Sequence, residues 1–170
     1  MKKWYAAKTA NYSLSRIKEF LERHEIEHFI PFHEVVLERD GKRVKVEKPV
    51  VPNYVFIHSV PEVCRTLFSE YFLPMSFLRC RESNDLLVVP DKQMDDFILL
   101  NSLPDDSFFL MPADLKHGDK VRVIRGQFAG IEGELIRIKG HKRVVVRLEG
   151  LFSLAVTTYI PRENIVKIDG

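Results

Sequence analysis

Beyond residue 118, short apolar runs alternate with glycines, and this pattern limits the possible fold more than any other feature of the chain. The apolar runs are residues 121–124, 135–138, 143–148, 151–158 and 165–168. Glycine favours tight turns because it adopts backbone angles that other residues resist. A small sheet of short strands protects its edges best when it closes on itself. The pattern therefore predicts a small five-stranded β-barrel.

Glycine and charge both divide the chain into two regions. Gly41 is the only glycine before residue 111, and the other seven follow it. The first 110 residues carry a net charge of −2, whereas the remaining residues carry +4. Polar residues and prolines typical of a linker lie between the two regions. We expect a first domain over residues 1–100, a linker over 101–114 and a barrel domain over 115–170.

The first region mixes helical and strand patterns, which predicts an α+β domain with an antiparallel sheet flanked by helices. Trp4-Tyr5 opens a short strand, and apolar residues then recur at helical spacing from Leu14 to Leu21. Asp40-Gly41 separates two strand-like runs, as in a hairpin whose turn needs positive φ at both central residues. Pro61 and Pro90 each precede a helical pattern, because proline fits the first turn of a helix.

The composition argues against membrane and secreted classes. No apolar run reaches the roughly 18 residues of a membrane span, and the mean hydropathy is −0.12. The basic start is not followed by the long apolar segment of a secretory signal. Cys64 and Cys80 form no Cys-x-x-Cys motif, so we expect a reducing, cytoplasmic compartment.

No pattern in the sequence indicates catalysis. The six histidines have neither the His-Glu-x-x-His spacing nor nearby cysteines at metal-ligand spacing. The glycine-rich stretch 126–133 is not followed by the Gly-Lys-Ser/Thr of a phosphate loop. We therefore expect no catalytic residue, no metal site and no cofactor, and an enzyme is the least favoured class.

The stretch from residue 118 to 133 carries the most informative motif. Its alternating valines can point into a barrel while Lys120 and Arg122 point outward. Phe128, between two turn glycines, can fill the barrel end. This spacing resembles the KOW motif of transcription elongation factors and some ribosomal proteins. The matching residues are Gly118, Val121, Val123, Gly126, Phe128, Gly130 and Gly133.

The first region resembles the N-terminal domain of the NusG family in the order of its features. These are Trp4-Tyr5, an amphipathic helix, the Asp-Gly hairpin, Pro52-Asn53-Tyr54-Val55-Phe56 and a helix after Pro90. General NusG proteins usually have Pro-Gly-Tyr at the fourth feature. The Asn form, with Leu21-Glu22-Arg23 and Pro61-Glu62-Val63, resembles the corresponding sequences of the specialised relative RfaH. The UpxY antiterminators are similar in size and layout, so the chain resembles a specialised paralogue of the RfaH and UpxY type.

This resemblance implies a transcription elongation and antitermination factor. In the family, the N-terminal domain binds the clamp helices of RNA polymerase and suppresses pausing or termination. The implied polymerase-binding residues are Val51, Pro52, Tyr54, Phe56, Thr66, Met94 and Phe97. Alternation along a strand places Tyr54 and Phe56 on one face and Val55 and Ile57 on the other, so one pair can be core. Ordinary core packing is the alternative reading of the whole set.

Sequence-specific relatives also contact the non-template DNA strand near their first helix. The matching positions are Lys8, Asn11, Tyr12, Arg16 and Arg23. Arginine beside an aromatic ring can hold an unpaired base by charge and stacking. A solvated helix face is the alternative, since Glu19 and Glu22 on the same helix oppose the positive field.

The KOW domain is implied to recruit a small-subunit ribosomal protein or another factor. Glu149-Gly150-Leu151-Phe152 replaces the loop through which general members contact Rho. β-branched residues at 144–146 and 156–158 favour a constitutive barrel over the helical hairpin of RfaH. We expect a monomer. A general NusG-like factor and a ribosome- or RNA-binding KOW protein remain alternatives.

Overall fold

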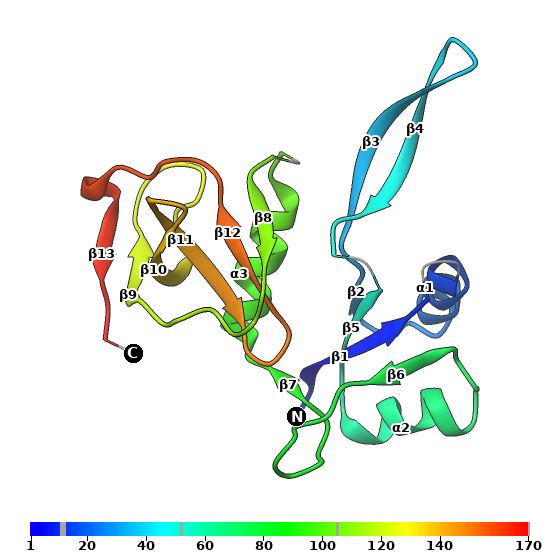
Figure 1. Ribbon diagram of the computed structural model, residues 1–170. Helices are drawn as coiled ribbons and strands as arrows, with labels where there is room; N and C mark the ends of the chain where they lie inside the picture. Colours follow the sequence, from blue (N-terminus) through cyan, green and yellow to red (C-terminus); the bar gives the residue numbers. More distant parts are fainter. Residues whose placement is uncertain (11–12, 52, 105, 170) are drawn as a thin grey trace. The chain divides into compact units, whose positions relative to one another are not determined.

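The computed structural model of the chain describes residues 1–10, 13–51, 53–104 and 106–169 (Figure 1). Its contacts divide the chain into two compact units, Met1–Val89 and Pro90–Gly170. Within the described residues, no helix has the length and apolar character needed to cross a membrane.

The first unit is built on an antiparallel sheet in the order β2-β5-β1-β6, with β7 also pairing with β1. Its strands are β1 (Lys3–Thr9), β2 (His28–Phe29), β5 (Tyr54–Ser59), β6 (Met75–Phe77) and β7 (Val88–Val89). The longest pairing joins β1 to β5 from Lys3↔Ser59 to Lys8↔Tyr54. This register places the expected opening strand at the centre of the sheet.

Two helices, α1 (Leu14–Arg23) and α2 (Pro61–Ser69), share one hydrophobic core with the sheet. The buried residues of α1 recur at the predicted helical spacing: Leu14, Ile17 and Leu21. α2 begins at Pro61, as expected, and buries Cys64 and Leu67. The core takes Val55 and Ile57 from β5, so both helices cover the face of the sheet on which these two residues lie.

The predicted hairpin is formed by β3 (Phe32–Arg39) and β4 (Lys42–Pro49), which make a separate two-stranded sheet (Figure 1). Its turn has φ of 51° at Asp40 and 73° at Gly41. Positive φ at both positions is what a type I′ turn requires, and this twist matches that of the flanking strands. The Asp-Gly signal therefore correctly predicted the turn.

The second unit contains a six-stranded antiparallel sheet in the order β13-β9-β10-β11-β12-β8. Its strands are β8 (Phe108–Met111), β9 (Asp119–Val123), β10 (Glu132–Ile138), β11 (His141–Leu148), β12 (Phe152–Val156) and β13 (Ile165–Lys167). A short 3₁₀ turn, η2 (Arg162–Asn164), precedes the last strand. The five expected apolar runs all form strands, and the fold class is confirmed.

Two elements of the second unit differ from the sequence-based expectation. The segment expected as a linker, residues 101–114, contains the end of α3 (Asp91–Ser102) and the whole of β8. β8 pairs with β12 from Phe108↔Val156 to Met111↔Ser153. By its contacts α3 is grouped with the second unit, which begins at Pro90, whereas the domain boundary at residue 100 stays a prediction.

Candidate functional site

Tyr54 and Phe56 lie on the face of β5 opposite the helices. Their rings stack with centroids 6.0 Å apart, and the Phe29 ring lies 6.4 Å from that of Phe56. Phe56 is fully buried, whereas Tyr54 is half-buried. Tyr54 is therefore the aromatic residue of this pair that a partner can reach without rearrangement.

Lys8 and Tyr54 are brought together by the pairing of β1 with β5. They face each other in register, and the Lys8 Nζ lies 5.5 Å from the centroid of the Tyr54 ring. A cation over an aromatic ring is attracted by the negative face of the ring. A residue expected to contact DNA and one expected to contact polymerase therefore form a single cationic-aromatic surface.

The remaining expected polymerase contacts of the first unit differ in accessibility. Val51 is 3% exposed. Thr66 is half-buried on α2, and its hydroxyl donates a hydrogen bond of 2.9 Å to the Glu62 carbonyl. Pro52 lies outside the described residues. Thr66 and Tyr54 thus remain the accessible members of this set in the first unit.

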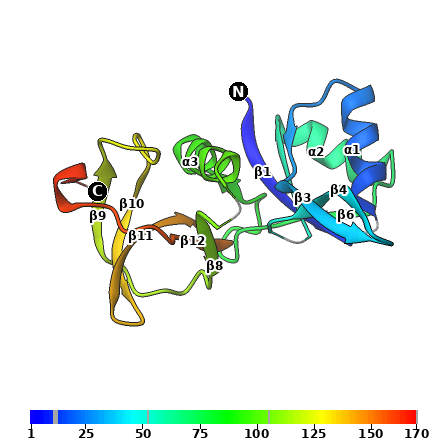
Figure 2. The ribbon, with the colours of Figure 1, turned by 90° about the horizontal axis from the view of Figure 1, so that it is seen from above.

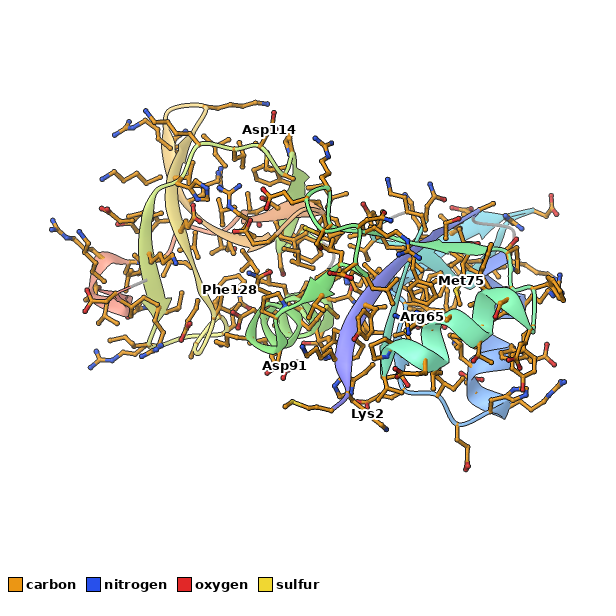
Figure 3. The ribbon with its side chains drawn as sticks, turned by 90° about the horizontal axis from the view of Figure 1, so that it is seen from below. Lys2, Arg65, Met75, Asp91, Asp114 and Phe128 are labelled. Atoms are coloured by element: carbon orange, nitrogen blue, oxygen red, sulfur yellow. The ribbon has the colours of Figure 1, made fainter. Side chains whose placement is uncertain are left out.

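A hollow beside α2 was not anticipated from the sequence. It has a volume of about 390 Å³, and Phe68, Phe77 and Leu86 line it together with Arg65. Figure 3 labels Arg65 on α2 and Met75 on β6, the strand that adjoins this region. Burial raises the pKa of the Cys64 thiol in the same wall to about 12, so this thiol stays protonated at neutral pH. Phe68 is exposed in the structure, and in the sequence it appears only as part of the apolar pattern that begins at Pro61.

Met94 and Phe97 are both fully buried on α3. The Phe97 ring meets the Phe152 ring of β12 edge-on at 5.6 Å, and α3 contacts β10 and β11. Figure 2 shows α3 alongside the C-terminal sheet. The apolar face of α3 is therefore used inside the second unit, and neither side chain is accessible in this arrangement.

Polar contacts reinforce the packing of α3 on this sheet. The Asp96 carboxylate is 3% exposed and accepts hydrogen bonds from Lys92 Nζ at 2.7 Å and the Glu132 backbone N–H at 3.2 Å. Lys92 also donates to the Gly130 carbonyl at 2.7 Å. Burial raises the pKa of Asp96, although its hydrogen bonds act in the opposite direction. Asp96 thus joins α3 to the first residue of β10, and Lys92 joins α3 to the loop that precedes this strand.

The expected DNA contacts on α1 are only partly available. Arg16 and Arg23 are exposed, but Arg23 is paired with Glu19 at 2.7 Å. Asn11 and Tyr12 lie outside the described residues. Arg16 is the exposed cation of this helix that has no ion pair with any described residue.

An aromatic cluster that the sequence analysis missed lies where α1 meets the end of α2. The Phe20 and His24 rings stack at 4.0 Å, and the Tyr71 ring lies 5.0 Å from Phe20 and 5.5 Å from His24. Tyr71 is 46% exposed. The spacing of Phe20 and His24, four residues apart on one helix, is the signal that could have revealed part of the cluster.

The KOW-motif residues begin just before β9 and continue through β9 and the loop after it to the start of β10. Gly126 and Gly130 have φ of 86° and 93°, as the sequence predicted for turn glycines. Phe128 between them is 4% exposed, and Val121 and Val123 are buried. Figure 3 shows Phe128 in the same unit as Asp91 of α3. A Cβ at Gly133 would lie 2.5 Å from the Val145 carbonyl, so close strand packing requires glycine there.

A buried ion pair holds Gly118, the first residue of the KOW motif, in place. Glu134 and Arg147 are both 7% exposed and lie 3.2 Å apart. Glu134 also accepts hydrogen bonds from Gly118 N–H at 3.1 Å and interacts with His117 at 3.0 Å. Arg147 donates to the carbonyls of Ala113 and Leu115. The pair therefore links the segment before β9 to β10 and β11 at the centre of the sheet.

Two family models match the chain, and the first of them extends from the first unit through most of α3. Residues 2–98 match the family model described as transcription termination factor NusG, and residues 117–147 match the KOW motif. Among solved structures, one described as "Domain interaction in Thermotoga maritima NusG" is similar, with a TM-score of 0.50. At 20% identity it covers 99% of this chain and 98% of that chain. At this identity the structural likeness concerns the fold alone.

Proposed function

Since the chain belongs to the NusG family of transcription factors, we propose that it is an antitermination factor of the specialised RfaH and UpxY type. It binds the clamp helices of RNA polymerase through its first unit and suppresses pausing or termination. Its KOW unit recruits a small-subunit ribosomal protein or another factor. The Pro-Asn-Tyr sequence at residues 52–54, in place of Pro-Gly-Tyr, supports the specialised type over a general NusG-like factor.

The observation that carries this proposal is the accessible surface around Tyr54. Tyr54 is half-buried and its ring stacks on that of Phe56, while Lys8 Nζ lies 5.5 Å from the centroid of the Tyr54 ring. Aromatic residues with a polar rim are typical anchors of protein interfaces. Thr66 on α2 supplies a second accessible contact from the same unit.

Met94 and Phe97 join this surface only after α3 leaves the C-terminal sheet. Both side chains are fully buried, and Phe97 packs on Phe152. The proposal therefore assigns them a polymerase contact in a rearranged state. Tyr54 and Thr66 make the contacts that need no rearrangement.

The non-template DNA strand is the second partner in this proposal. Arg16 supplies an exposed cation on α1, and Phe20, His24 and Tyr71 supply stacked rings near the same helix. Stacking platforms beside cations are the usual way in which proteins hold single strands. Arg23 contributes less because Glu19 already neutralises it.

Recovery of core RNA polymerase on the immobilised full chain tests the polymerase contact. We expect Tyr54→Ala to reduce the recovered polymerase about tenfold, as truncation of an interface anchor does. Tyr159→Ala is the matched control, because Tyr159 is an exposed tyrosine of the other unit. Circular dichroism checks that both variants are folded. Equal recovery by Tyr54→Ala and the wild type would count against the assignment.

A further inference from the structure

The hollow beside α2 is not used by the proposed polymerase contact. Its walls come from α2, from β6 and from the segment 79–86 that follows this strand. Its volume of about 390 Å³ lies within the range of sites that bind small ligands. Two arginines line it, but no aspartate or glutamate does so among the described residues. The hollow is therefore apolar and carries positive charge.

The helical wall is formed by one face of α2. Arg65, Phe68 and Ser69 lie three and four residues apart, so their side chains share this face. The Ser69 hydroxyl donates a hydrogen bond of 3.0 Å to the Arg65 carbonyl, which satisfies this hydroxyl within the helix. Phe68 and Arg65 are therefore the groups of this wall that a ligand can contact.

The opposite wall is held in place by backbone pairing. Arg79 and Leu86 face each other in an antiparallel bridge, and the Cys80 N–H donates to the Asp85 carbonyl at 2.8 Å. Side chains of residues that are directly opposite in such a pair lie on the same face. Phe77, two residues before Arg79, lies on this face too, because side chains alternate along a strand. The wall is thus formed before any ligand binds.

Both arginines can accept an anion. Arg65 lies 3.8 Å from Glu62, and the two side chains are 64% and 75% exposed. An exposed pair of this kind contributes little, so a ligand carboxylate can replace Glu62. Arg79 is exposed and donates a hydrogen bond of 2.8 Å to the Asn84 carbonyl, which uses one of its several N–H groups.

We propose that this hollow binds a small aromatic carboxylate. Its ring contacts Phe68, Phe77 and Leu86, because aromatic rings pack favourably against one another in offset and edge-on arrangements. Its carboxylate lies between Arg65 and Arg79, since guanidinium groups bind carboxylates through charge-assisted hydrogen bonds. An aliphatic acid fits less well because it makes no ring-to-ring contact. The binding does not rest on the proposed function.

Titration of the ¹⁵N-labelled full chain with 2-naphthoate, followed by the NMR amide shifts, tests the site. We expect a dissociation constant on the order of 0.1 mM, as suits a ligand of this size. The largest shifts are expected at residues 64–69, 76–79 and 84–87. 2-Naphthamide has the same rings without the charge, and we expect it to bind about tenfold more weakly. Decanoate has the carboxylate without the rings, and we expect about fivefold weaker binding.

Substitutions on the two kinds of contact locate the ligand. Arg65→Gln and Phe68→Ala are each expected to weaken the binding of 2-naphthoate about fivefold. Both side chains are more than half exposed, so neither substitution removes core packing. Arg81→Gln and Phe72→Ala are the matched controls, because both residues are exposed and lie outside the lining of the hollow. We expect both controls to bind like the wild type.

Several results would overturn the proposal. They are no amide shifts up to about 2 mM 2-naphthoate, shifts confined to residues away from the hollow, and equal affinity for 2-naphthamide. Unchanged binding in both Arg65→Gln and Phe68→Ala would equally refute it. Decanoate binding as tightly as 2-naphthoate would contradict the aromatic class of the ligand. No polymerase is present in this assay, so its failure is distinguishable from failure of the polymerase contact.

Discussion

The pKa values of two buried carboxylates of the second unit are shifted in opposite directions. Burial raises the pKa of Asp96, and its bonds from Lys92 and the Glu132 N–H do not reverse this effect. Burial also acts to raise the pKa of Glu134, but hydrogen bonds from Arg147, His117 and the Gly118 N–H lower it overall. The number and charge of the donors therefore determine the outcome.

Glu134 should make the second unit sensitive to acid. Its pKa in the folded chain lies below the ordinary value of 4.5, so the unfolded chain binds a proton more readily. The ionised Glu134 carboxylate therefore stabilises the folded chain fully above pH 4.5, and this stabilisation is lost as the pH falls through the lowered pKa of Glu134. Glu134→Gln leaves Arg147 buried without its counter-charge. We therefore expect this substitution to lower the free energy of unfolding by about 3 kcal/mol at pH 7.

Urea unfolding followed by the NMR amide signals of β10 and β11 measures this effect. The difference in unfolding free energy between the wild type and Glu134→Gln is expected to shrink as the pH falls from 7 to 3. Glu149→Gln, an exposed carboxylate of the same unit, serves as the control. A difference that stays constant over this pH range would contradict the prediction.

At the scale of elements, local sequence patterns predicted turns and strand faces correctly. They did not predict which strands pair when these are far apart in the sequence. The hairpin turn was predicted correctly because its geometry is determined by its two central residues, Asp40 and Gly41. The alternation along β5 separated Tyr54 and Phe56 from Val55 and Ile57 because strand geometry is periodic. β8 was missed, since Phe108–Met111 lies in a polar segment and gains its place by pairing with β12.

α3 illustrates the same limit for the candidate site. Its periodicity identified an apolar face with Met94 and Phe97, but periodicity does not say which sheet covers that face. In the structure this face packs on the C-terminal sheet through contacts such as Phe97 with Phe152. The aromatic cluster of Phe20, His24 and Tyr71 was missed for a related reason, since Tyr71 joins it from a distant part of the chain.

Asp96→Ala tests how strongly α3 is held on the sheet. The change leaves the Glu132 N–H without its acceptor and Lys92 without its carboxylate. We expect it to lower the free energy of unfolding by about 1–3 kcal/mol. We expect faster hydrogen exchange throughout α3. Asp95→Ala is the control, because Asp95 is the exposed neighbouring residue on the same helix. Equal exchange in both variants would show that Asp96 does not hold the helix.

At the scale of the whole molecule, the position of α3 affects the proposed polymerase contact. Release of α3 makes Met94 and Phe97 accessible, and both belong to the proposed binding set. We therefore expect Asp96→Ala to bind core RNA polymerase about three- to tenfold more tightly than the wild type, by titration in fluorescence anisotropy. Asp95→Ala should bind like the wild type. Weaker or unchanged binding by Asp96→Ala would remove Met94 and Phe97 from the contact.

The central claim is that the surface around Tyr54 lies against the clamp helices of the polymerase. A photo-crosslinking amino acid in place of Tyr54, irradiated in the complex with a transcribing polymerase, tests it most directly. The same amino acid in place of Tyr159 is the control. We predict that crosslinks from position 54 map to the clamp helices and that those from position 159 do not. Crosslinks from position 54 that reach no polymerase residue, or only residues outside the clamp helices, would contradict the account.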